Sequence, residues 1–140
     1  MKKSIRIGFA AIIAASAMIY SCGKYDDGPK MSLASKKGRL ANTWVFESEF
    51  KNGTDITSQT SSNYTGTSET YAKDGSYTYS VGSLAVTGKW EFLDGKEDVK
   101  ITMTGSTDSD TIHVVRLTSK ELWTKDMDGS DTYITHYKGK

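Results

Sequence analysis

Few side chains in this 140-residue chain could do chemistry, and Cys22 is the most informative of them. It is the only cysteine, so it has no partner within the chain for a disulfide. Such a thiol is either a buried or free cysteine or an attachment point for fatty acids. The residues before it favour the second interpretation. Lys2, Lys3 and Arg6 form a basic start, and residues 7–20 are apolar or small and carry no charge, a layout that predicts a secretory signal.

The residues ending in Cys22 specify the kind of signal. The apolar run is shorter than the roughly 20 residues that span a bilayer. The sequence Ile19-Tyr20-Ser21-Cys22 resembles the lipobox of bacterial lipoproteins, in which an aliphatic, a variable and a small residue precede the cysteine. The resemblance implies that residues 1–21 are a signal peptide, removed by cleavage before Cys22, and that acyl chains on Cys22 attach the protein to a membrane.

Residues 22–38 read as a lipidated tether, because they hold the only proline and a group of basic residues. Within them, Gly23 to Asp27 resembles the Lys- and Asp-rich export signals of some Gram-negative surface lipoproteins; a solvated tether is the alternative. Residues 31–40 could form a short helix with Ser32 as its N-cap. We therefore expect a lipid-anchored protein of the outer membrane, and the sequence leaves open whether it faces the periplasm or the cell surface.

Length and charge limit the possibilities for the chain beyond the tether. Cleavage removes 21 of the 140 residues and leaves 119, enough for one small domain. It also removes three basic residues, so 15 basic side chains face 17 acidic ones, a balance of −2. A nearly neutral chain gives no reason to expect nucleic acid as a partner.

Apolar and polar residues alternate with a period of two over most of the chain after the tether, which is typical of antiparallel strands with one wet face. In residues 43–50 the even-numbered positions from Trp44 to Phe50 share the apolar face, and the odd-numbered ones, among them Glu49, share the other. Strands are predicted near residues 43–50, 55–60, 66–73, 76–81, 84–93, 98–104, 110–117, 121–127 and 131–138, the second being the weakest pattern.

Four Asn-Gly or Asp-Gly pairs separate these runs, and such pairs tolerate the positive φ that tight hairpins require. They are Asn52-Gly53, Asp74-Gly75, Asp94-Gly95 and Asp128-Gly129. An up-and-down sheet of about eight strands closes into a barrel, which removes its edges. We therefore expect an all-β, up-and-down antiparallel β-barrel over residues 39–140. A two-sheet sandwich is the alternative, but it needs longer crossover connections.

Four segments, taken in order, resemble the small bacterial lipocalin-like lipoproteins. The first is Leu40-Ala41-Asn42-Thr43-Trp44, with Asn42 where the family has glycine. The others are a Lys-Asp-Gly turn between strands at residues 71–79, a Gly-x-Trp strand at residues 88–92, and a Leu-Thr-x-x-x-Leu turn at residues 117–122. The resemblance covers about residues 39–138 and implies a lipocalin-like barrel.

Aromatic side chains that share the apparent inward phase could line a cavity for a small hydrophobic ligand. They are equally what a filled barrel core requires. The candidate ligand-binding residues are Trp44, Phe46, Tyr77, Tyr79, Trp90 and Phe92.

The remaining polar candidates favour no enzyme and no cofactor. His113 and His136, the only histidines, show no metal-ligand spacing and no positioned nucleophile. Residues 126–131 resemble part of a calcium loop, but a hairpin turn explains them better. Two functions are consistent with the sequence: a lipid-anchored module that binds a small hydrophobic ligand, or a structural lipoprotein whose filled barrel displays loops to an envelope or host protein.

Overall fold

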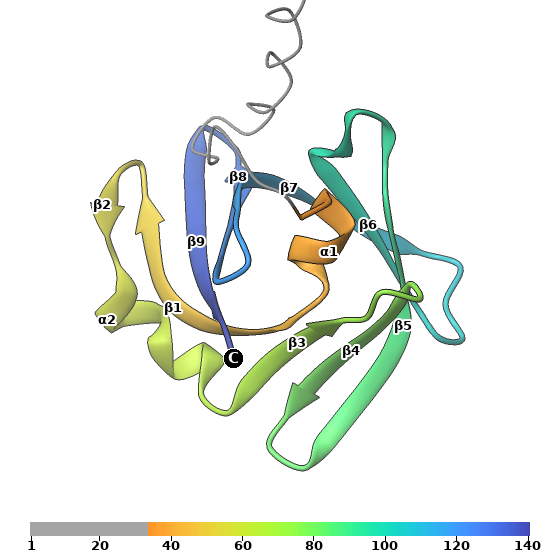
Figure 1. Cartoon of the computed structure of the whole chain (residues 1–140). Helices are drawn as coiled ribbons and strands as arrows, with labels where there is room; N and C mark the ends of the chain where they lie inside the picture. The colour runs from red at the N-terminus through yellow and green to blue at the C-terminus, as the bar shows by residue number, and fades with distance from the viewer. Residues whose placement is uncertain (1–33) are drawn as a thin grey trace, which may run out of the picture.

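The computed structural model describes residues 34–140 (Figure 1), so the predicted signal peptide, Cys22 and most of the predicted tether lie outside the described residues. The described chain is mostly strand. Its strands are β1 (Thr43–Lys51), β2 (Thr54–Asp55), β3 (Thr67–Tyr71), β4 (Ser76–Val81), β5 (Leu84–Phe92), β6 (Asp98–Met103), β7 (Ser109–Leu117), β8 (Glu121–Asp128) and β9 (Asp131–Gly139).

The strands form one antiparallel sheet that closes on itself. Each strand from β3 to β8 pairs with the next one along the chain, and β1 pairs with both β3 and β9. Eight strands thus close a barrel, and the two-residue β2 only extends the free edge of β1. The prediction of an up-and-down antiparallel β-barrel is confirmed.

Short helices occupy the chain where sequence patterning was weakest. The first, α1 (Lys36–Leu40), begins later than predicted, because the Ser35 hydroxyl, and not Ser32, caps it by accepting from the Gly38 amide at 3.0 Å. The strand predicted at 55–60 is wrong beyond β2: α2 (Thr57–Thr60) and η1 (Ser61–Tyr64) follow instead. A fourth helical segment, η2 (Asp94–Lys96), connects β5 to β6. None of the described helices is long and apolar enough to cross a membrane.

The apolar core lies at the end of the barrel that α1 covers, where Figure 1 shows this helix within the ring of strands. Leu40 and Trp44 are fully buried, and the Trp44 indole N–H donates to the Leu40 carbonyl at 2.9 Å. This bond ties the helix to the first strand and satisfies the one polar atom of the ring. The buried cluster comprises Leu40, Trp44, Tyr71, Tyr77, Trp90, Val99, Ile101, Val114, Leu117 and Leu122.

A β-bulge in β1 corrects two sequence predictions. The pairing with β9 shifts register between Phe46 and Ser48, so one extra residue enters β1 there. Side chains beyond the bulge therefore change face. Phe50, predicted to face inward, packs on the outer face against His136, with ring centroids 4.9 Å apart. Glu49, predicted to face water, is only 8% exposed and faces the interior.

Candidate functional site

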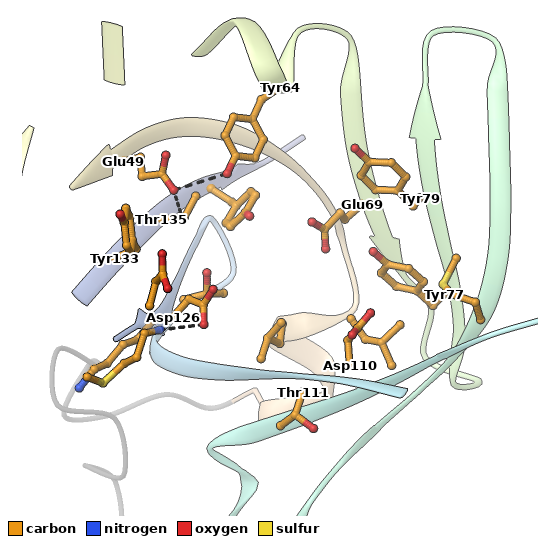
Figure 2. A pocket seen from close by; sticks show the side chains of 18 residues that line it. Glu49, Tyr64, Glu69, Tyr77, Tyr79, Asp110, Thr111, Asp126, Tyr133 and Thr135 are labelled. Carbon is orange, nitrogen blue, oxygen red and sulfur yellow. Dashed lines mark hydrogen bonds between the residues drawn. The ribbon is translucent and has the colours of Figure 1, made fainter. Parts of the chain in front are cut away.

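The interior of the barrel away from α1 is hollow. A cavity of about 1000 Å³ lies there, open to solvent (Figure 2). Its wall comes from η1 and from every barrel strand except β5, and it mixes carboxylates, tyrosines and a few aliphatic groups. It is lined by Glu49, Tyr64, Glu69, Tyr77, Tyr79, Ile101, Met103, Asp110, Thr111, Ile112, Thr124, Lys125, Asp126, Met127, Asp128, Tyr133, Thr135 and Tyr137.

Glu49 is held in place by its backbone as well as its side chain. Past the bulge, β1 no longer pairs with β3, and α2 takes over: the Glu49 amide donates to the Thr57 hydroxyl at 3.0 Å, and the Ile56 amide donates to the Glu49 carbonyl at 2.9 Å. Its carboxylate Oε1 accepts from the hydroxyls of Thr135 at 3.2 Å and Tyr64 at 3.5 Å. Neutral hydroxyls thus orient a buried carboxylate.

Glu69, on β3, is the second interior carboxylate. Its Oε2 accepts from the Tyr71 hydroxyl at 2.8 Å, and the Tyr77 hydroxyl also hydrogen-bonds to it. Burial raises the pKa of Glu69, and these two hydrogen bonds act in the opposite direction. Burial and the nearby carboxylate also raise the pKa of Tyr71 and Tyr77, so both remain protonated donors at neutral pH.

Tyrosines form much of the remaining wall. In Figure 2, Glu49 and Tyr64 lie on one side of the cavity and Tyr77 and Tyr79 on the other. Tyr64 also stacks on Phe46, with ring centroids 4.0 Å apart and planes 2° from parallel. Because β1 and β3 pair at only two positions, this stack fills the gap that opens between them. Burial raises the pKa of Tyr64 and of Tyr137, so the phenols stay neutral.

The charge of the cavity wall is strongly negative. Lys125 is its single basic residue, against five acidic ones, so four negative charges are in excess when all are ionised. The whole chain, by contrast, has a formal charge of +1. The acidic lining residues are Glu49, Glu69, Asp110, Asp126 and Asp128.

The six aromatic residues predicted to bind a ligand divide between the cavity and the core. Tyr77 and Tyr79 line the cavity. Trp44 and Trp90 lie in the buried cluster, Phe92 packs against it, and Phe46 fills the gap beside Tyr64. Of the six predicted residues, only these two tyrosines lie in the cavity wall, and their role in ligand binding remains a prediction.

Sequence reasoning missed most of the polar lining. It places Glu49 on the wrong face because a bulge leaves no mark on alternation. It also names none of Asp110, Asp126 and Asp128 as a site residue, yet all three lie near strand ends in the cavity wall. A usable signal was present in β9, where Tyr133, Thr135 and Tyr137 alternate and all face the cavity.

The histidines and the calcium-like segment lie elsewhere. His113 pairs with Asp98 at 2.6 Å on a partly exposed face, and His136 stacks on Trp123 with centroids 3.9 Å apart. The interpretation of residues 126–131 as a hairpin turn is confirmed, since Asp128 pairs with Asp131 across Gly129 and Ser130. Among residues 34–140, no three His, Cys, Asp or Glu side chains are grouped so that they could hold a metal ion.

Comparison with known proteins identifies the fold. A lipocalin-like protein from Bacteroides uniformis ATCC 8492 superposes with a TM-score of 0.51 at 14% identity, over 74% of this chain and 100% of the other. The chain has the lipocalin-like fold. A DUF4847 family protein from Bacteroides vulgatus ATCC 8482 matches this lipocalin-like barrel with a TM-score of 0.50 at 16% identity, over 70% of this chain and 92% of the other. No family model and no curated protein matches the sequence.

Proposed function

We propose that this protein binds a small organic ligand inside its lipocalin-like barrel and is held at the outer membrane by acyl chains on Cys22. It acts as a binding module and not as an enzyme, and nucleic acid is not its partner. The observation that supports ligand binding is the cavity of about 1000 Å³ with buried tyrosine and carboxylate groups in its wall. Ligand sites are commonly concave, largely pre-formed and equipped with a few oriented polar groups.

The cavity favours ligand binding over the alternative function, a filled barrel that displays loops. A filled barrel needs a solid interior, and side chains fill this one only at the end covered by α1. The proposal for the anchor rests on the lipobox-like residues before Cys22. An anchored barrel would keep a captured ligand at the cell envelope.

Native mass spectrometry of protein purified from its own host tests ligand binding. We expect a copurified small molecule with the parent protein and none with Thr124→Trp, because Thr124 lines the cavity and the larger ring would occupy it. Thr78→Trp is the matched control, since Thr78 lies between the inward-facing Tyr77 and Tyr79 and so faces outward. Equal occupancy in the parent and Thr124→Trp, or no small molecule in any preparation, would contradict the proposal.

A further inference from the structure

We infer that the ligand of this cavity is a small organic cation that carries N–H donors on an apolar body, such as a primary amine, and that the Glu49 and Glu69 carboxylates recognise it. This inference rests on the proposed function and names the class of ligand. It replaces the purely hydrophobic ligand expected from the sequence, because the wall of the cavity is acidic and hydroxyl-rich.

Glu49 provides the strongest support. Its side chain is more than nine-tenths buried, yet both hydrogen bonds to its carboxylate end on Oε1. Oε2 has no partner among the described residues. Among the side-chain nitrogen and oxygen atoms of residues 34–140, Arg39 Nε is the one that is both fully buried and without a hydrogen-bond partner. Oε2 of Glu49 has no partner either, so it is not fully buried, and it is open to the cavity that Glu49 lines. A buried carboxylate with a free oxygen facing a hollow is an acceptor for a ligand N–H group.

Within residues 34–140 no ion pair compensates the two interior carboxylates, since Lys125, the one basic residue of the wall, forms none with either. The ion pairs of the described chain join Lys51 to Asp131, Lys100 to Glu91, His113 to Asp98 and Arg116 to Glu121. Glu49 and Glu69 receive only hydroxyl donors. Burying a carboxylate without an opposite charge is costly, and a bound cation would remove that cost.

The rest of the wall matches a cation with an apolar body. Tyr77 and Tyr79 lie opposite Glu49 in Figure 2, and tyrosine rings attract cations placed over their faces. The three carboxylates of Asp110, Asp126 and Asp128 also line the wall and add to the attraction of cations from solution. Aliphatic contacts come from Ile101, Met103, Ile112 and Met127.

A metal ion fits this site poorly. In the described residues no group of three acidic, histidine or cysteine side chains converges as metal ligands. A calcium ion takes six to eight oxygen ligands at short range. Glu49 and Glu69 instead lie apart around a cavity large enough for an organic molecule (Figure 2).

Isothermal titration calorimetry with three probes of equal chain length tests the inference: n-octylamine, which is cationic at pH 7, neutral n-octanol and anionic n-octanoate. We expect n-octylamine to bind about tenfold or more tightly than the other two. Glu49→Gln, which keeps the shape of the side chain, should weaken n-octylamine binding about tenfold and change n-octanol binding by less than about twofold. Glu47→Gln is the matched control, because Glu47 is exposed on the same strand.

The possible outcomes separate this inference from the proposed function. If all three probes bind alike, or if Glu49→Gln loses all three equally, the inference fails while ligand binding stands. If n-octanoate binds best, the inference is also wrong. If no probe binds and native mass spectrometry finds no small molecule, both proposals fail. The comparison of probes on the parent protein decides the matter even if Glu49→Gln does not fold.

Discussion

At the residue scale, the interior carboxylates lower the stability of the fold but are the groups proposed to bind the ligand. Glu69 lies in a wall where Tyr71 and Tyr77 donate to it, and the phenols of Tyr64 and Tyr137 lie close enough for its charge to raise their pKa values. Burial raises the pKa of Glu69, so the folded protein holds that proton more tightly than the unfolded chain does. The contribution of Glu69 to the free energy of unfolding is therefore largest below the pKa of the unfolded chain, about 4.3, and falls as the pH rises through the pKa of the folded protein.

Glu69→Gln removes this dependence. We expect the variant to be more stable than the parent at pH 7, with the difference disappearing as the pH falls to about 4, because the parent carboxyl is then also neutral. Urea unfolding at a series of pH values measures it, with Glu47→Gln as a control that leaves the profile unchanged. A parent that gains stability over Glu69→Gln as pH rises would contradict this assignment. The same substitution should weaken binding of n-octylamine, a trade between stability and function.

At the scale of elements, one feature of the strands shapes the cavity and another sets how closely two strands approach. The bulge in β1 turns Glu49 inward, and α2 then supplies the hydrogen bonds that β3 no longer provides. On the other side of the barrel, β5 approaches β6 so closely at Gly88 that a Cβ there would lie 2.5 Å from the Thr102 carbonyl oxygen. A glycine is needed at that point because the obstacle is backbone, which cannot move aside like a side chain.

Gly88→Ala therefore forces β5 and β6 apart. We expect a loss of ~2–3 kcal/mol in the free energy of unfolding, in the range for an overfilled site, measured by urea denaturation. Gly53→Ala is the comparison, because Gly53 has φ +81° with nothing within 4 Å of the new Cβ. It should cost about 1 kcal/mol through backbone strain alone. A smaller loss for Gly88→Ala than for Gly53→Ala would show that the strands separate easily.

At the scale of the whole molecule, charge is distributed unevenly between interior and surface. The chain as a whole is nearly neutral, with 18 basic and 17 acidic residues, but the cavity wall is acidic. Such a wall attracts small cations without making the outer surface strongly charged. The proposed attachment to a membrane is a separate property, because it would depend on Cys22, which lies outside the described residues.

Cys22→Ser is expected to release the protein from membranes. Acyl chains contribute about 0.8 kcal/mol per buried CH₂, and without them the barrel has no predicted anchor. Membrane fractionation of cells fed a labelled palmitate analogue measures both the location and the loss of label. The released Cys22→Ser protein should bind n-octylamine as the parent does, because residues 34–140 contain the complete barrel. Unchanged membrane association would remove the support for a lipid anchor.

The sequence alone determined the eight strands of the barrel and the hairpins between most of them, and hence the barrel, but not the helical segment at residues 57–64. Alternation of period two is a local property of each strand, and the Gly residues of the predicted turns at positions 53, 75, 95 and 129 all have positive φ. Trp44 and Trp90 were also placed inward correctly, although they pack in the core. These features depend on neighbours in sequence, so they can be read from it.

Only the tertiary structure decided what the barrel encloses. Glu49 faces the cavity because pairing with β9 places a bulge in β1, and that pairing joins opposite ends of the domain. Glu49 and Thr135 meet across 86 positions of sequence. Barrel closure likewise brings Asp110, Asp126 and Glu69 into the wall of one cavity. Local periodicity carries no record of contacts made by closure. For that reason the sequence predicted Tyr77 and Tyr79 in the interior but not the carboxylates that lie beside them.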